Sequence, residues 1–151
     1  MLSILDIEVF VHGSLCVSYS GQCLFSSLVG GRSGNRGACA GSCRLPYDIV
    51  DKNNIVLTKT KKYPLSMKDL CAISSIGNLI DIGVNSFKIE GRMKSREYVY
   101  LVTKLYRDAI DSYLKTGKVF INYDILKKLK KVFNREYTLG YLNNVFNNDV
   151  I

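Results

Sequence analysis

The segment from His12 to Arg44 constrains the fold more than any other part of the chain. It holds seven of the twelve glycines and four of the five cysteines, with little helical or strand periodicity. Loops of this length are uncommon inside compact domains, and long irregular segments are usually functional or held together by a bound group. The rest of the fold has to accommodate this cysteine-rich loop.

Two short β elements flank the loop. The apolar, β-branched run over residues 4–11 predicts a buried strand that stops at His12-Gly13. Residues 49–57, with a turn at 51–54, predict a short hairpin.

The second half of the chain has helical periodicity. Ser66 followed by Asp69 is typical of a capping box and predicts a helix over residues 67–82 that ends near Gly83. Residues 85–90 predict a further strand. Ser95 then fits the N-cap of a long amphipathic helix that reaches Gly117.

This order of elements indicates an α/β fold. Alternating strands and helices are typical of parallel sheets and barrels, but a closed eight-stranded barrel needs roughly 200 residues or more. The chain has 151 residues and starts almost directly with a strand that no earlier helix covers. We therefore expect a partial TIM-barrel-like fragment, with a long Cys/Gly-rich loop and C-terminal helices, that lacks an N-terminal piece. Residues 1–116 would be the C-terminal portion of the barrel-like domain, and 117–151 a peripheral segment.

Composition limits the location and the partners of the protein. No apolar run is long enough to span a bilayer and no leader pattern opens the chain, so we expect a cytoplasmic protein that does not bind a membrane. The net charge of +8 and the pI of about 9.3 favour anionic partners such as RNA. Many of the late lysines fit an ordinary solvated helix face equally well.

The cysteines are spaced in an unusual way for zinc. Cys16 and Cys23 are separated by six residues, Cys23 and Cys39 by fifteen, and Cys39 and Cys43 by three, and Cys71 follows later. Structural zinc sites usually pair cysteines two to four residues apart, whereas iron-sulfur clusters accept varied spacings. A cluster would act as the core of the loop, and buried cysteines without a metal are the alternative.

Charged residues mark two further candidate sites. Arg32 and Arg36 lie among flexible glycines, an arrangement that suits a bound phosphate or carboxylate. Lys88, Glu90 and Arg92 surround the end of the predicted 85–90 strand, where ligands bind in parallel α/β proteins. A solvent-exposed loop is the alternative for the arginines.

The single histidine, His12, follows the first predicted strand. It could serve in acid/base chemistry or have a structural role at the strand end. No Walker loop, Gly-x-Ser-x-Gly elbow or His-Glu-x-x-His helix occurs, so no nucleotide cofactor is indicated.

Several motifs along the chain form a recognisable series. The longest covers residues 8–26, EVFVHGSLCVSYSGQCLFS. It is followed by 35–39 (NRGAC), 43–44 (CR), 66–71 (SMKDLC), 87–99 (FKIEGRMKSREYV) and 106–111 (YRDAID). In these motifs and in their order the chain resembles the U-type collagenase-like peptidases, peptidase family U32. Residues 134–141 also resemble a later family motif, but Glu136 stands where a glycine is common.

The resemblance implies a longer enzyme with a barrel-like catalytic domain. Some members are described as collagenases, and others resemble oxygen-independent hydroxylases of tRNA or rRNA bases that hold a four-iron four-sulfur cluster with four cysteines. Carried over to this chain, the cluster ligands are Cys16, Cys23, Cys39 and Cys71, with Cys43 as the substitute.

Three functions remain open at this stage. The first, which the resemblance implies, is iron-sulfur-dependent hydroxylation of a nucleic-acid base, and the thiols, cations and single histidine suit a cluster with an anionic substrate better than peptide hydrolysis. The catalytic candidates are His12, Glu90 and Arg92, and the anion-binding candidates are Arg32, Arg36 and Lys88. A cysteine-dependent peptidase is the second possibility. The third is an inactive truncated chain that binds a second chain carrying the N-terminal half of the barrel.

Overall fold

The chain divides into two compact units in the computed structural model, which describes residues 5–57, 63–142 and 150. The first unit combines Met1–Ser14 with Lys68–Val150, and the second is the segment Leu15–Met67. The second unit therefore contains most of the cysteine-rich loop.

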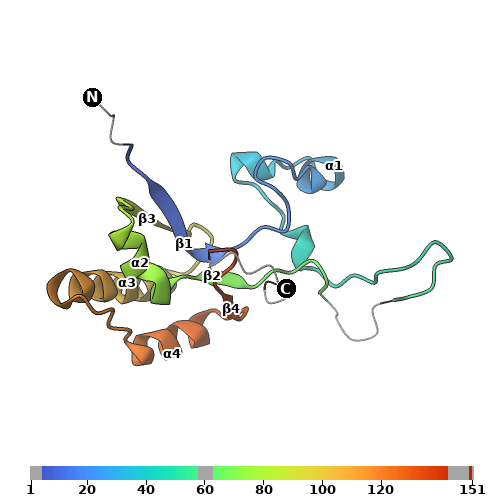
Figure 1. Ribbon diagram of the computed structural model, residues 1–151. Coiled ribbons are helices and arrows are strands. Elements are labelled where there is room, and N and C mark those ends of the chain that lie inside the picture. The colour runs from blue at the N-terminus through green and yellow to red at the C-terminus, as the bar shows by residue number, and fades with distance from the viewer. Residues whose placement is uncertain (1–4, 58–62, 143–149, 151) are drawn as a thin grey trace. The chain divides into compact units, whose positions relative to one another are not determined.

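The first unit is built on a four-stranded mixed sheet with the strand order β3-β1-β2-β4 (Figure 1). The strands are β1 (Glu8–Ser14), β2 (Asp69–Cys71), β3 (Ser86–Ile89) and β4 (Tyr137–Thr138). β1 pairs with β3 in parallel and with β2 in antiparallel orientation, and β2 pairs with β4 in parallel. The predicted α/β class is confirmed as a mixed α/β fold, and the strand predicted over 85–90 is confirmed as β3.

β1 runs past the point where the sequence predicted its end. The predicted stop at His12-Gly13 is wrong, because both residues pair with β2, in the register His12↔Cys71 and Gly13↔Leu70. Gly13 has a positive φ of 138°, which residues with a side chain rarely adopt. A Cβ at this position would lie 2.8 Å from the Cβ of Glu90. The glycine therefore allows β1 to approach the residue after β3 rather than ending the strand. Residue 4, where the predicted strand began, lies outside the described residues.

The helix predicted over residues 67–82 is wrong in its first half. Asp69 starts β2 instead, and the helical part is limited to a 3-10 turn, η3 (Ile73–Ser75), and α2 (Ile76–Asp81). The two residues of the supposed capping box have other partners. The Ser66 hydroxyl accepts a hydrogen bond from Arg44, and Asp69 is fully buried beside β1 and β4.

The long helix α3 (Arg96–Thr116) is confirmed at both ends. The Ser95 hydroxyl accepts a hydrogen bond of 3.2 Å from the backbone N–H of Tyr98, which is a standard N-cap. Gly117 ends the helix with φ of 70°, a conformation that glycine adopts without steric cost.

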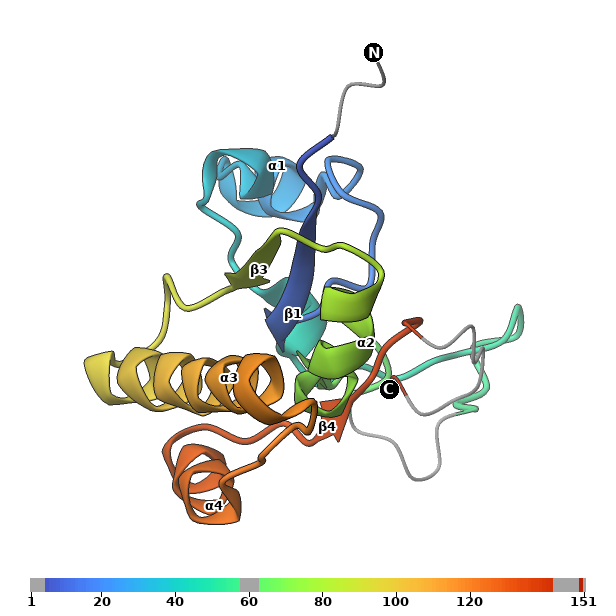
Figure 2. The same ribbon diagram turned by 60° about the vertical axis from the view of Figure 1, so that its left-hand side comes forward.

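A second helix, α4 (Tyr123–Val132), lies alongside α3 (Figure 2). Its buried residues are Ile125 and Leu129, and its lysines 127, 128, 130 and 131 are exposed. The solvated lysine face is thus confirmed. The predicted boundary at residue 116 stays a prediction, although α4 contributes to the same core as α3.

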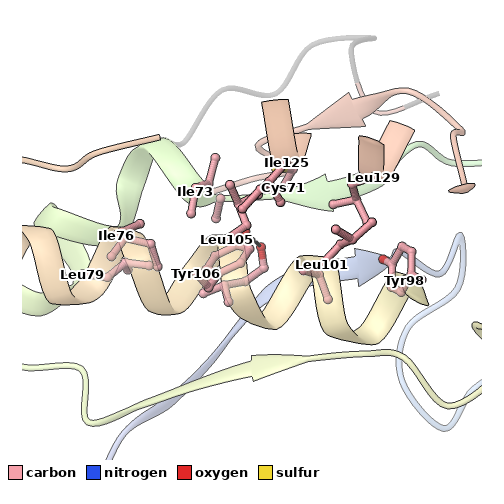
Figure 3. Packing of buried hydrophobic residues seen from close by; sticks show 14 residues of the cluster. Cys71, Ile73, Ile76, Leu79, Tyr98, Leu101, Leu105, Tyr106, Ile125 and Leu129 are labelled. Atoms are coloured by element: carbon pink, nitrogen blue, oxygen red, sulfur yellow. Dashed lines mark hydrogen bonds between the residues drawn. The ribbon is translucent and has the colours of Figure 1, made fainter. Parts of the chain in front are cut away.

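The core of the first unit lies around α3. Figure 3 shows Leu105 and Tyr106 of α3 pointing toward Cys71 and Ile125. Burial of such side chains stabilises a fold by roughly 1.5 to 3 kcal/mol each, so this cluster accounts for most of the stability of the unit. Its further members include Val11, Ile73, Ile76, Leu79, Leu101, Val102, Ala109 and Leu129.

The second unit contains short helices and one small hairpin. The helices are α1 (Phe25–Gly30) and two 3-10 turns, η1 (Gly34–Arg36) and η2 (Ser42–Arg44). The predicted hairpin is confirmed by the antiparallel bridge Val50↔Val56 and by a turn in which the Asp51 carboxylate accepts hydrogen bonds from the backbone N–H groups of Asn53 and Ile55.

The Arg44 side chain links the two ends of the second unit by hydrogen bonds. Its guanidinium donates to the carbonyl of Leu15 at 2.6 Å, to the carbonyl of Met67 and to the hydroxyl of Ser66. These partners lie at the first and last residues of the unit. One side chain thus fixes both ends of the segment.

Replacing Gly13 with alanine tests the approach of β1 to Glu90. We expect the free energy of unfolding to fall by about 3 kcal/mol, because the new Cβ meets Glu90 and the φ of 138° is strained. Urea denaturation followed by circular dichroism measures the change. Gly117→Ala is the control, since its φ is 70° and nothing lies within 4 Å. An equal loss in both variants would show that contact with Glu90 has no role.

Candidate functional site

Four of the five cysteines surround one pocket in the second unit. Cys16, Cys23, Cys39 and Cys43 all line it, and its volume is about 440 Å³. This volume falls within the range of small-molecule and cofactor sites. Its other lining residues are Val17, Ser18, Tyr19, Ser20, Gly21, Phe25, Ser26, Gly34, Asn35, Ser42 and Leu65.

Local backbone structure holds Cys39 at the pocket. Its sulfur accepts a hydrogen bond of 3.3 Å from the backbone N–H of Gly41 and lies 4.0 Å from the hydroxyl of Ser26. Ser26 is itself buried and accepts a hydrogen bond from the N–H of Ala40. Gly41 has φ of 68°, so a glycine suits the turn that aims its N–H at the sulfur.

The pKa of the Cys43 thiol depends on the charges of the three neighbouring cysteines. Burial raises its pKa, the adjacent Arg44 guanidinium lowers it, and negative charge on Cys16, Cys39 and Cys23 raises it again. Ionisation of one thiol in this pocket would thus oppose ionisation of Cys43. A bound metal centre would remove that opposition, because thiolates are the ligands of iron-sulfur clusters and of zinc.

Cys71 belongs to the first unit. It is buried in the core beside Tyr106, and burial raises the pKa of its thiol while a hydrogen bond from the backbone of Ile73 opposes the shift. Within residues 5–57, 63–142 and 150, no three His, Cys, Asp or Glu side chains stand close enough to hold a metal ion as placed. The four pocket thiols are gathered around a space rather than closed onto one point, and their donor chemistry fits a thiolate-bound cluster.

His12 is fully buried in the first unit. Its Nδ1 lies 3.3 Å from the hydroxyl of Tyr106, which donates its proton to the carbonyl of Val11 at 2.8 Å. Since that proton is already used, we assign the proton of the imidazole to Nδ1, with Tyr106 accepting it. Nε2 is then an acceptor, and among the described residues it has no hydrogen-bond partner.

Burial and the nearby Lys94 ammonium lower the pKa of His12 to about 4. The imidazole is therefore neutral at pH 7 and is packed against the rings of Tyr98, Tyr106 and Tyr137. Its surroundings are those of a core residue, and its predicted acid/base role stays a prediction.

Asp69 is a buried carboxylate that the sequence interpretation missed. It is fully buried, 3.8 Å from the Arg135 guanidinium and 4.0 Å from the Lys94 ammonium. Burial, followed by the charge of Asp69, raises the pKa of Tyr98 to about 12. The capping-box interpretation hid Asp69, and no alternation in the three-residue strand DLC could have revealed it, because all three residues are buried.

The charged residues after β3 lie where they were predicted, at the end of the strand. Glu90 accepts a hydrogen bond of 2.9 Å from the backbone N–H of Arg92, so its carboxylate stabilises the turn. Arg92 and Lys88 are exposed. Their predicted catalytic and anion-binding roles stay predictions.

Arg32 and Arg36 belong to the second unit, like the cysteine pocket, and both are exposed. Each stands beside a glycine in the left-handed conformation, Gly31 and Gly37, with φ of 61° and 77°. Arg36 directly follows Asn35, which lines the pocket. Arg36 is thus the sequence neighbour of a residue that lines the cysteine pocket.

The single histidine makes its buried state directly measurable. We expect the one imidazole signal in the NMR spectrum to titrate near pH 4 in the folded protein and near pH 6.5 in urea. Because the unfolded chain binds this proton more tightly, stability falls as the pH drops from 6.5 to 4, by about 3 kcal/mol in all. A folded protein that titrates near 6.5 would show a solvated His12.

Curated relatives match much of the chain. It is 50% identical over 109 residues to the 23S rRNA 5-hydroxycytidine C2501 synthase of Escherichia coli, covering 72% of this chain and 16% of the relative. It is 40% identical over 143 residues to tRNA hydroxylation protein P1 of Bacillus subtilis, covering 91% and 34%. It is 41% identical over 139 residues to a collagenase of Porphyromonas gingivalis, covering 89% and 33%.

The chain spans about a third or less of the length of these relatives. No solved structure matches it. In the part of the chain that the structure describes, no helix has the length and apolar character to cross a membrane.

The family comparison agrees with the motifs and with the relatives. The model of Peptidase family U32 matches residues 2–149, which is nearly the whole chain. This protein therefore belongs to peptidase family U32.

Proposed function

We propose that this chain is the cluster-binding part of a family U32 enzyme that hydroxylates a base of tRNA or rRNA. The observation that carries the proposal is the arrangement of Cys16, Cys23, Cys39 and Cys43 around one pocket. Two of the relatives described above are named for hydroxylation of RNA or synthesis of a hydroxylated nucleoside.

The pocket is suited to a four-iron four-sulfur cluster. Such clusters are held by cysteine thiolates, and hydrogen bonds to the sulfurs tune their potential. The N–H of Gly41 already points at the sulfur of Cys39, and Arg44 adds positive charge beside Cys43. Bound there, the cluster would supply one-electron chemistry to the site.

Two cysteines compete for the fourth ligand position. The resemblance to the family implies Cys71 beside Cys16, Cys23 and Cys39, whereas the local geometry offers Cys43, which lines the same pocket. Cys71 lies in the core of the other unit. Replacing each one separately decides between them.

The charge of the chain supports an RNA substrate. A net charge of +8 attracts the phosphate backbone at long range. The exposed Arg32 and Arg36 belong to the same unit as the cysteine pocket, and guanidinium groups bind phosphate well. Their role would be to position the RNA rather than to read its sequence.

A peptidase is the second candidate, because a relative is named collagenase. A cysteine peptidase needs a thiolate activated by a histidine. The strand partner of His12 is Cys71, but burial raises the pKa of that thiol and keeps His12 neutral. Both pKa shifts disfavour the ionised thiolate–imidazolium pair that a cysteine peptidase uses. They therefore favour the hydroxylase over the peptidase.

The proposed activity belongs to a complete barrel. The parallel pair β1 and β3, with α2 before β3, supports this proposal, whereas the antiparallel strand β2 beside β1 departs from the all-parallel barrel pattern. We propose that further strands, from additional chain or from a second protein, complete a TIM-like barrel. An inactive chain that binds such a partner is the remaining alternative.

Serine replacements test the cluster. Purified without oxygen and reconstituted with iron and sulfide, the natural chain is expected to bind about four irons and absorb visible light. Cys16→Ser, Cys23→Ser and Cys39→Ser should lose most of the iron. Of Cys43→Ser and Cys71→Ser, the one that loses iron identifies the fourth ligand.

Ser42→Ala, which changes a pocket residue without touching a thiol, is the matched control and should keep its iron. A natural chain that stays iron-free after reconstitution, and in which a thiol reagent counts five free thiols once the protein is unfolded, would overturn the cluster. Mass spectrometry of nucleosides from RNA treated with the complete enzyme then tests hydroxylation, and cleavage of gelatin without any change in the RNA would favour the peptidase.

A further inference from the structure

Tyr19 is an exposed aromatic residue at the cysteine pocket. Its side chain is 89% exposed, yet it is one of the residues that line the pocket. Tyr19 therefore lies on the solvent side of the pocket lining. Tyrosine is among the residues enriched where proteins contact their partners.

The backbone around Tyr19 is held in place. The Tyr19 carbonyl accepts hydrogen bonds from the N–H of Gln22 at 3.1 Å and from the hydroxyl of Ser18 at 3.3 Å. The side chain of Asn35, in η1, donates to the carbonyl of Gly21 at 3.2 Å. The turn that carries Tyr19 is therefore tied to η1, which also carries Arg36.

The neighbouring wall is apolar and partly aromatic. Phe25 and Val17 line the same pocket, and each is 43% exposed. A flat ring stacked on Tyr19 would meet these apolar residues and the four cysteines in the same pocket lining. Exposed π faces of this kind bind unpaired bases, with little dependence on base identity.

We propose that Tyr19 stacks on an unpaired nucleobase and presents it at the cysteine pocket. The occupant is single-stranded RNA, because the chain is strongly cationic and two exposed arginines, Arg32 and Arg36, belong to the same unit. This inference rests on the proposed function and names the residue that receives its substrate. Tyr19 binds the substrate in this scheme, and it is not needed for the four cysteines to hold a cluster.

Binding of a labelled single-stranded RNA of roughly 12 nucleotides, followed by fluorescence anisotropy, tests the stacking. Tyr19→Ala should weaken binding about tenfold, within the range of a lost base stack. Tyr19→Trp should bind at least as tightly as the natural chain, since indole stacks well. Tyr19→Leu, similar in apolar character but without a π face, should behave like the alanine variant.

Tyr123→Ala is the matched control. Tyr123 is 71% exposed and lies on α4 in the other unit, so its loss should leave RNA binding unchanged. Equal binding by the natural chain and Tyr19→Ala would overturn the inference, as would Tyr19→Leu binding like the natural chain. Tyr19-dependent binding of unfolded gelatin, with no binding of RNA, would also overturn it.

Iron content separates this inference from the proposed function. Tyr19→Ala should keep the iron of the natural chain, because Tyr19 supplies no ligand. If no variant holds iron but RNA binding still depends on Tyr19, the stacking stands and the cluster fails. If the cluster forms and Tyr19 has no effect on RNA binding, the cluster stands and the stacking fails.

Discussion

The hydroxyl of Tyr106 is the interaction on which the first unit depends. It donates to the carbonyl of Val11 in β1 and accepts from Nδ1 of His12, so a single group on α3 fixes the helix to the central strand. That position is fully buried, and a hydrogen bond left unmade there would cost about 1 to 3 kcal/mol. The same contact holds the buried imidazole of His12, whose pKa is lowered by burial and by Lys94, and Cys71 packs into the same core.

The elements that the sequence predicted well are those governed by local rules. Helix α3 has an N-cap at Ser95, an apolar stripe and a terminal glycine, and each of these acts within a few residues. The segment 67–82 shows the opposite case. Ser66 and Asp69 satisfy a local capping pattern, but pairing of Asp69 with two strands distant in sequence outweighs it. The role of Gly13 was missed for the same reason, since its contact partner Glu90 lies about half the chain away in sequence.

The candidate site was predictable in its residue types and only partly in its grouping. The resemblance to the family implied Cys16, Cys23 and Cys39, which do share one pocket, but it named Cys71 as the fourth ligand and Cys43 only as the substitute. In the structure Cys43 lines that pocket and Cys71 is buried in the core of the first unit. The backbone also explains why a glycine is common at the position of Glu136 in the family that the chain resembles. This residue has φ of 62°, where a glycine has less strain.

The clasp formed by Arg44 has a consequence for how the protein can vary. Because Leu15 and Met67 are both bonded to one guanidinium, the segment between them begins and ends at nearly the same place. Segments with adjacent ends can be lengthened, shortened or exchanged without moving the residues outside them. The segment Leu15–Met67 can therefore vary in length without a change in the sheet. Its hairpin, which carries the bridge Val50↔Val56, is a place where residues could be added or removed at little cost to the sheet.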